Sequence, residues 1–367
     1  MGFESGAVSF RWYHLPHPLP DDAIERLAAH AAPPLEAIGA EEVGGWVSSR
    51  HLLDRVLKAE SVIREGWILA TLRLSARKIP PALLAAECRM EELALRAVED
   101  SPAVRRRQRQ EIRRAVIERL LPQMPPQFRA IPMAHRPTTS FLYAAALSDS
   151  LSDLFTAHFR HTFGFPATSL DAAAAAVLLR RLDVRDLPPA SFSPQVPDRD
   201  VPVEIGREFL TWLWFQAETV RDRIEVPRHP PLALQIEGPL VLAREGEGAH
   251  VTTLRDGEPL YSAEAKTCLM AGKRLCRARF AVGVQGMVWR MTFDGDTFVF
   301  RSLTLPEDPQ RTDPGSRFLE RMMRLETFRE IWLALYGRFL DERTDSNRWT
   351  PLKSRMREWV QQRPAHL

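Results

Sequence analysis

The chain has 367 residues, of which 45% are hydrophobic and 26% are charged. These fractions are typical of a globular protein, and the length allows two domains. The formal net charge of +3 excludes a uniformly basic, histone-like chain, so any strongly basic surface must be local. Three scattered cysteines (Cys88, Cys268 and Cys276) form no Cys-x-x-Cys pair, which indicates reduced thiols rather than a disulfide framework.

The N-terminus and the longest apolar run bear on targeting. Glu4 and Arg11 interrupt the N-terminus before any apolar stretch, so we expect no signal peptide. The longest apolar run, residues 172–179, is too short to cross a bilayer. We therefore expect a cytoplasmic protein without a membrane partner.

The first half of the chain mixes strands and helices without a strict βαβ alternation. This order predicts an α+β fold with mixed antiparallel sheets and long helices. We expect strands over 7–15, 37–47 and 66–75, a strand hairpin over 128–133 and 140–147, and helices over 21–32, 80–99, 148–163 and 170–182.

The most distinctive segment is a basic helix, predicted over residues 102–121 between two prolines. It carries seven arginines and two glutamates, and Arg106, Arg109 and Arg113 recur at helical spacing beside a narrow apolar face. Charges this dense repel one another, and a phosphate backbone would relieve the repulsion. The alternative is a solvated helix in a chain whose coding bias favours arginine, because it has 45 Arg and only 5 Lys.

The second half begins with a proline-rich stretch over 187–203, which predicts a linker or an extended crossover. The helix over 204–220 is apolar on nearly every side. Its Trp212, Trp214 and Phe215 either stack nucleic-acid bases or, as we favour, belong to the core. Beyond it we expect paired strands over 232–243 and 250–254, a helix over 262–272 capped by Ser262, a meander over 274–282, 287–293 and 297–305, and a helix over 317–343.

The last long helix carries Phe318, Leu325, Trp332 and Phe339 at seven-residue spacing. Such a stripe is typical of a dimer seam or of a helix lying on its own sheet, and we favour the second. Residues 344–367 form a basic tail that is either solvated or in contact with phosphate. The predicted organisation is an N-terminal α+β domain over 1–186, a linker over 187–203, a C-terminal α+β domain over 204–343 and the tail.

Motifs for catalysis are absent. No segment matches a phosphate-binding loop or a nucleophile elbow. His158 and His161 have a spacing that can hold a metal, but no Cys, Asp or Glu signature accompanies them. Asp198, Asp200 and Glu204 could hold Mg²⁺, yet a solvated loop in the proline-rich stretch is the simpler interpretation. We therefore expect no enzyme, no catalytic residues, no cofactor and no metal site.

Four local patterns follow one another along the chain. Gly45-Trp46-Val47 ends an early strand, and the sequence RKIPPALL from Arg77 opens a helix. The basic helix closes in Leu120-Leu121-Pro122 ahead of Phe128, and Glu264 stands eight residues before Gly272-Lys273 and Leu275. In this order the patterns resemble the bacterial recombination-associated protein RdgC family.

The resemblance implies an α+β protein that forms a ring-shaped homodimer around double-stranded DNA, with little sequence preference. It also implies a nucleoid-associated role in recombination and antagonism of RecA. A basic helix without a base-reading motif agrees with this, because phosphate contacts carry no sequence information. The residues expected to line the DNA are Arg77, Lys78, Arg105, Arg106, Arg109, Arg113, Arg114, Lys273 and Arg274.

Two other classes of protein stay open at the level of sequence. One is a metal-dependent nucleic-acid-processing enzyme that uses the carboxylates of residues 198–204. The other is a protein-interaction module whose arginines meet an acidic partner. Mg²⁺-dependent DNA cleavage would identify the first, and failure of bulk duplex DNA to compete would identify the second.

Overall fold

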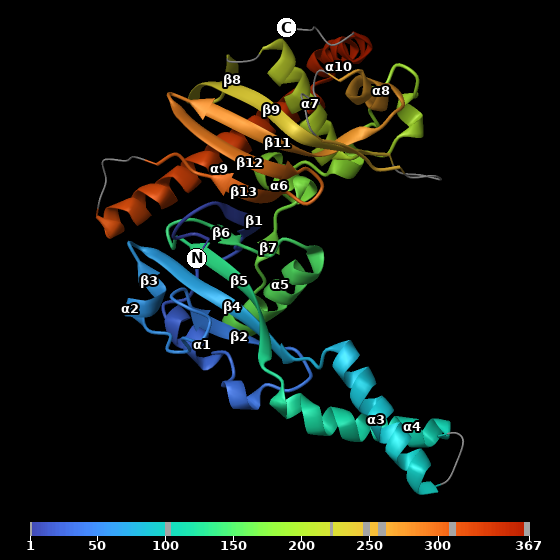
Figure 1. Ribbon diagram of the computed structural model, residues 1–367. Helices are drawn as coiled ribbons and strands as arrows, with labels where there is room; N and C mark the ends of the chain where they lie inside the picture. The colour runs from blue at the N-terminus through green and yellow to red at the C-terminus, as the bar shows by residue number, and fades with distance from the viewer. Residues whose placement is uncertain are drawn as a thin grey trace. The chain divides into compact units, whose positions relative to one another are not determined.

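The computed structural model describes residues 2–99, 104–220, 223–244, 250–255, 262–307 and 313–362. It has an α+β fold with a large antiparallel sheet, as the sequence predicts (Figure 1). The chain forms two compact units that alternate along the sequence. Unit 1 comprises Met1–Pro18, Ala134–Ser152 and Ala167–Leu367, and unit 2 comprises Leu19–Met133 and Asp153–Pro166.

This division differs from the sequential domains expected over 1–186 and 204–343. The reason lies in the proline-rich stretch over 187–203, which crosses unit 1 instead of joining two bodies. Ala190 and Phe192 are buried there, and the Phe192 ring packs against Trp349 with 6.0 Å between ring centres. The stretch is therefore an extended crossover, held by apolar burial within one unit.

Unit 1 is built on an antiparallel sheet with the strand order β10-β9-β11-β12-β13-β1-β6. The strands are β10 (Thr252–Leu254), β9 (His229–Ala243), β11 (Arg274–Val284), β12 (Met287–Asp294), β13 (Val299–Thr304), β1 (Val8–His14) and β6 (Phe141–Ala144). Short β8 (Ile224–Val226) and β7 (Thr168–Ser169) pair with β9 and β1. The predicted strand pair β9–β10 and the meander β11–β12–β13 are confirmed.

Helices α7 (Ile205–Thr219) and α9 (Pro314–Thr344) pack on one face of this sheet. The Trp332 ring lies 5.7 Å from Phe280 and 4.8 Å from Phe293, centre to centre. The predicted core role of Trp212, Trp214 and Phe215 is confirmed, because all three are buried. The seven-residue stripe of α9 is also buried, so the interpretation of a helix on its own sheet is confirmed.

Unit 1 also contains the shorter helices α6 (Ala172–Arg180), α8 (Ala263–Met270) and α10 (Ser346–Gln361). The predicted cap of α8 is confirmed, since the Ser262 side chain accepts a hydrogen bond from the Glu264 amide. The expectation of a basic tail over 344–367 is wrong for residues 346–361. They form α10, which buries Trp349, Met356 and Trp359, while residues 363–367 lie outside the described residues.

A buried ion-pair network joins the helices of unit 1 to its sheet. Glu208 on α7 lies 2.7 Å from the Arg343 guanidinium on α9, and neither side chain exceeds 1% exposure. Arg274 on β11 lies 3.1 Å from Glu204 and 3.8 Å from Glu208. Charges this deeply buried require counter-charges, so the network fixes how these elements pack.

Within unit 2 the sheet has the strand order β5-β4-β2. Its strands are β2 (Val43–Ser48), β4 (Trp67–Arg77) and β5 (Pro126–His135), with short β3 (Ile63–Arg64) on β4. Helices α1 (Ala23–Ala29), α2 (Ala59–Val62) and, from Asp153 onward, α5 (Asp149–Phe163) belong to this unit. Gly44 on β2 leaves room for His158 of α5, whose Nε2 would lie 2.2 Å from an added Cβ.

A helical hairpin extends from the sheet of unit 2. Helix α3 (Pro81–Glu99) follows β4, and α4 (Arg106–Leu120) leads through a short 3₁₀ turn into β5 (Figure 1). The basic helix was expected over 102–121, but it begins four residues later. Arg105 is extended (φ −68°, ψ 155°), and its amide donates to the Gln108 side chain at 2.9 Å. Pro102 lies outside the described residues.

Candidate nucleic-acid interface

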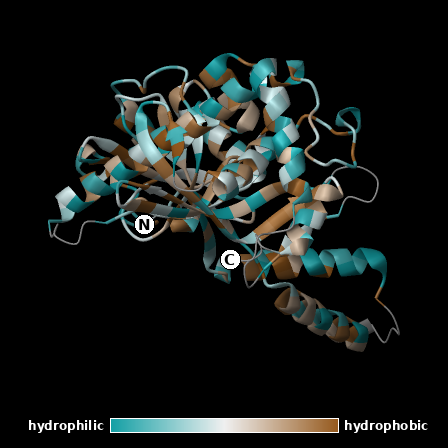
Figure 2. Ribbon diagram, turned by 90° about the horizontal axis from the view of Figure 1, so that it is seen from above, coloured by the Kyte–Doolittle hydropathy of each residue, from teal (hydrophilic) through white to brown (hydrophobic). Residues whose placement is uncertain are grey.

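The outer face of α4 is the most basic surface that the sequence identified. We define it as Arg105, Arg106, Arg107, Arg113 and Arg114, all of which are exposed. Arg106 and Arg113 are two helical turns apart, about 10 Å along the axis. Among the described residues, Arg105, Arg106 and Arg113 have no carboxylate partner. Figure 2 shows the contrast within the hairpin, because α4 is coloured hydrophilic and α3 is mixed.

The inner face of α4 uses its arginines to hold α3. Arg119 lies 2.9 Å from Glu87 and 3.1 Å from Glu91. Arg109 lies 3.6 Å from Glu92, so one member of the stripe expected on the surface is turned toward α3. These pairs, together with the buried Val116 and Leu120, orient α4 so that its other arginines face outward.

Two outer-face arginines are paired along the helix. Arg107 lies 3.1 Å from Glu111, and Arg114 lies 2.9 Å from Glu118. The arginine side chains are 90% and 84% exposed, so these ion pairs contribute little to stability and are readily exchanged for other partners. The outer face can therefore offer all five guanidiniums to a polyanion.

Arg77 and Lys78, the two residues at the end of β4 that we expected to line the DNA, have different surroundings. Arg77 is half-buried and donates to the carbonyl oxygens of Ile38 at 2.9 Å and Leu35 at 3.0 Å, and also to that of Met124. These contacts tie β4 to the loops beside it, so they occupy the guanidinium. Lys78 is exposed next to it and stays available for an anion.

The predicted pair on β11 also separates. Arg274 is 5% exposed, and it donates to the Ala190 carbonyl at 2.8 Å besides pairing with Glu204. Its guanidinium is inside the buried network, so the expectation that it contacts DNA is corrected: a buried, paired cation cannot reach a phosphate. Lys273 is half-buried and contacts the Thr252 hydroxyl on β10.

A second arginine-rich surface lies on the sheet face of unit 1 opposite α7 and α9. Arg277 and Arg279 on β11, Arg290 on β12 and Arg301 on β13 form it. Arg277 lies 2.8 Å from Asp294, and Glu237 receives Arg279 at 3.0 Å and Arg290 at 3.5 Å. Arg301 donates to a backbone carbonyl and has no carboxylate partner among the described residues.

Sequence reasoning missed these sheet residues, although a signal for them was present. Successive side chains of a strand point to opposite faces. Buried Ala278 and Phe280 alternate with Arg277 and Arg279 on β11. An arginine within an alternating strand therefore marks the open face, a pattern less conspicuous than seven arginines on one helix.

The carboxylates considered for Mg²⁺ already have cationic partners. Asp198 lies 2.6 Å from Lys353 and 2.7 Å from Arg357, both on α10. Glu204 faces Arg207 and Arg274. Within the ranges that the structure describes, no group of three or more His, Cys, Asp or Glu residues is arranged to hold a metal ion.

The histidines considered as ligands have other neighbours. The His158 Nδ1 is bonded to the Leu154 carbonyl at 2.9 Å. The His161 ring packs edge-on against His30, with 4.7 Å between ring centres. The first contact lies within α5, and the second packs α5 against the end of α1 in unit 2.

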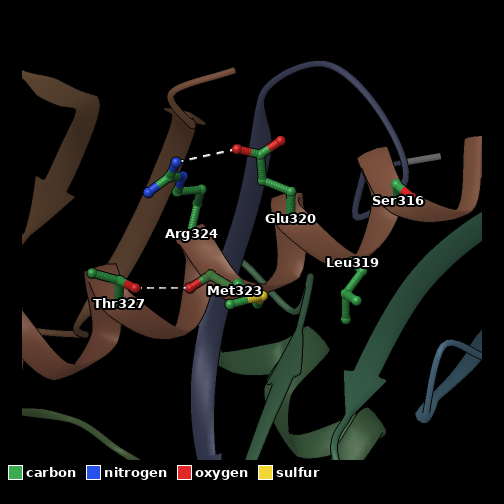
Figure 3. A pocket seen from close by; sticks show the side chains of 6 residues that line it. All are labelled: Ser316, Leu319, Glu320, Met323, Arg324 and Thr327. Atoms are coloured by element: carbon green, nitrogen blue, oxygen red, sulfur yellow. Dashed lines mark hydrogen bonds and ion pairs between the residues drawn. The ribbon is translucent and has the colours of Figure 1, made fainter. Parts of the chain in front are cut away.

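A pocket of about 200 Å³ lies along the first half of α9 (Figure 3). Its lining alternates apolar Leu319 and Met323 with Glu320 and Arg324, and these two charged groups pair at 3.1 Å. Because its cation is already paired with a carboxylate, the pocket is a weaker anion site than the outer face of α4.

Comparison with known proteins gives no family: no protein-family model matches this chain, and the search of curated proteins finds no match. The likeness to the RdgC family therefore stays a prediction from the local patterns. Among the described helices, none combines the length and apolar character needed to span a membrane.

Proposed function

We propose that this protein binds double-stranded DNA without sequence specificity, in the manner of the RdgC family. The observation that carries the proposal is the outer face of α4, where Arg105, Arg106 and Arg113 are exposed without a carboxylate partner among the described residues. Duplex DNA supplies regularly spaced negative charge, and its neutralisation releases bound counterions.

The arrangement of these arginines argues against reading of bases. Direct readout requires side chains on an element that enters the major groove and matches donors and acceptors on base edges. The outer face of α4 offers guanidiniums on a helix whose exposed neighbours are mostly Gln and Glu, and the sequence holds no helix-turn-helix or zinc-finger pattern. Phosphate contact positions a duplex without selecting its sequence.

A homodimer is part of this proposal. The α9 stripe is buried in unit 1, so the surface that we assign to the partner copy is the exposed apolar side of α3. Met90, Leu93 and Val98 are 61%, 50% and 84% exposed there, on a helix next to the arginines of α4. By the same resemblance we propose antagonism of RecA in recombination, in a nucleoid-associated protein of the cytoplasm.

The DNA-binding proposal is tested with several unrelated duplexes across a salt series. We expect equal affinity for all of them and a steep loss of affinity with salt, with a log–log slope of about −0.9 per phosphate neutralised. A strong preference for one sequence, or affinity independent of salt, contradicts the proposal. DNA cleavage in the presence of Mg²⁺ identifies a nuclease instead, and a partner that bulk duplex cannot displace identifies a protein-interaction module.

The dimer is tested by light scattering on a Leu93→Glu variant. Placing a carboxylate on the apolar side of α3 should convert the dimer to a monomer, because the charge would be buried in the seam. Val177→Glu on α6 is the matched control, since Val177 is 53% exposed on unit 1. A parent that is monomeric, or an equal effect of both variants, contradicts the assigned seam.

A further inference from the structure

A hollow of about 690 Å³ opens on the face of the unit 1 sheet that carries Arg277 and Arg301. Strands β9 to β13 provide most of its lining, and Arg207 from the first turn of α7 and Asp296 from the turn between β12 and β13 add to it. Pro239 and Val241 on β9 form an aliphatic wall, and hydroxyl groups of Thr253 and Thr292 lie among the lining side chains. The volume falls within the range of small-molecule and cofactor sites.

The charges around the hollow are unequally paired. Arg207 lies 2.9 Å from Asp296, and Arg277 lies 2.8 Å from Asp294. Arg301 and Arg255 complete the lining, and neither has a carboxylate partner among the described residues. The hollow is therefore net positive, with its uncompensated charge on these two arginines.

Arg301 is held in place by the backbone around it. Its Nη2 donates to the Leu147 carbonyl at 2.9 Å, which leaves the remaining donors of the guanidinium for another acceptor. Pairing of β12 with β13 shifts register next to Thr292, and Ser302 has φ +52°. Such bulges re-aim side chains, and here one lies beside an arginine that faces the hollow.

The electrostatic surroundings of Arg301 favour an anion. Burial and the guanidiniums of Arg277 and Arg11 lower the pKa of Arg301, while Asp294 opposes them. A cation crowded by two others is stabilised by an anion that reaches it. Cys276 adds no charge there, because burial raises the pKa of its thiol to about 12.

We propose that this hollow seats one sugar-phosphate unit of a nucleic acid strand, with the phosphate bound by Arg301 and the sugar against Pro239 and Val241. The inference rests on the proposed DNA binding and adds a second contact surface, on unit 1. No aromatic residue is among the described residues that line the hollow, so a base finds no stacking platform there. The seat would read the backbone and not the sequence.

The test compares Arg301→Gln with Arg290→Gln by fluorescence anisotropy on one duplex across a salt series. Arg290 lies on the same sheet face but outside the hollow, and it is 49% exposed and paired with Glu237. We expect Arg301→Gln to weaken binding about tenfold and to lower the salt slope by about 0.9, as the loss of one phosphate contact requires. Arg290→Gln should change affinity less than twofold.

Two further arms address folding and the source of the phosphate. Arg301→Lys keeps the positive charge and should retain most of the affinity, and Arg255→Gln removes charge from the hollow without touching the Leu147 bond. Inorganic phosphate and thymidine monophosphate, titrated against the parent by calorimetry, should bind far more weakly than the duplex. Tight binding of either one identifies a site for a small free anion and overturns the backbone seat.

The outcomes separate this inference from the proposed function. If the parent binds the duplex, and Arg301→Gln and Arg255→Gln both bind like Arg290→Gln, the seat is wrong while DNA binding stands. If the parent does not bind DNA, the proposed function fails and the seat fails with it. Loss of duplex affinity in Arg301→Gln and Arg255→Gln but not in Arg290→Gln, with Arg301→Lys retaining affinity, supports the seat.

Discussion

The arginines on the outer face of α4 and those in the buried network of unit 1 carry the same guanidinium group, but the first are exposed and the second are buried. In the network, Arg343 meets Glu208 at 2.7 Å, with both side chains almost fully buried. On the outer face of α4, Arg106 and Arg113 are exposed and have no carboxylate among the described residues. In a chain this rich in arginine, burial and partner decide the role of a guanidinium, and abundance does not.

The largest expected effect comes from removing a carboxylate of the buried network. Glu208→Ala leaves the guanidinium of Arg343 buried without a counter-charge and removes one of the two carboxylates beside Arg274, which keeps Glu204. We expect a loss of about 3–5 kcal/mol in the free energy of unfolding, measured by urea denaturation. Glu111→Ala on the exposed side of α4 is the control and should cost under about 1 kcal/mol. Equal losses of unfolding free energy in the two variants would contradict the view that burial makes a carboxylate partner more important for stability.

A buried lysine in unit 1 allows the effect of burial on a cation to be measured through the pH dependence of stability. Lys266 on α8 lies 3.1 Å from Glu218 and 3.3 Å from the centre of the Trp359 ring. Trp214 and Trp359 donate their indole N–H groups to the same carboxylate, each at 2.6 Å. Burial lowers the pKa of Lys266 from 10.5 to about 8, and Glu218 opposes this shift.

The sign of the pH effect follows from proton binding. Between pH 8 and 10.5 the unfolded chain holds the Lys266 proton and the folded chain has lost it, so this residue makes stability rise with pH. The contribution should reach about 3 kcal/mol across that window. It is measured as the difference in unfolding free energy between the parent and Lys266→Met. A difference that is constant from pH 7 to 10.5 contradicts the buried, shifted amine.

The expected sequence elements were recovered where periodicity was strong, as in the meander over β11, β12 and β13 and the stripe of α9. Those patterns depend on neighbours within one segment, so a single sequence contains them. The packing of α10 was missed, because its basic residues conceal the buried Trp349, Met356 and Trp359. Asp198 receives Lys353 and Arg357 of that helix, a contact across more than 150 residues that local pattern does not encode.

The candidate site was recovered in part for the same reason. Helical spacing places Arg106 and Arg113 on an open face, as expected. Helical spacing alone does not show that Arg109 pairs with Glu92 or that Arg274 is buried and paired with Glu204, because each pair depends on a residue of another element. Long-range partners therefore separate the free arginines from the structural ones.

The smallest expected effect comes from removing the carboxylates that pair with exposed arginines of α4. Glu111→Gln and Glu118→Gln together remove the only two acidic residues of α4 and release Arg107 and Arg114. Duplex affinity should rise about two- to fivefold, since surface ion pairs of this kind are each worth under about 1 kcal/mol. Thermal stability should stay nearly unchanged. Weaker DNA binding in this variant would mean that the glutamates orient the arginines for contact.

The most direct measurement compares two variants that lose the same charge. One changes Arg105, Arg106 and Arg113 to Gln, and the other changes Arg185, Arg199 and Arg348, exposed arginines of unit 1, to Gln. Duplex affinity and its salt dependence are measured for both by anisotropy, after circular dichroism has shown that both are folded. We expect a salt slope lower by about 2 to 3 in the α4 variant alone. Equal slopes in the two variants would contradict a phosphate-binding outer face on α4.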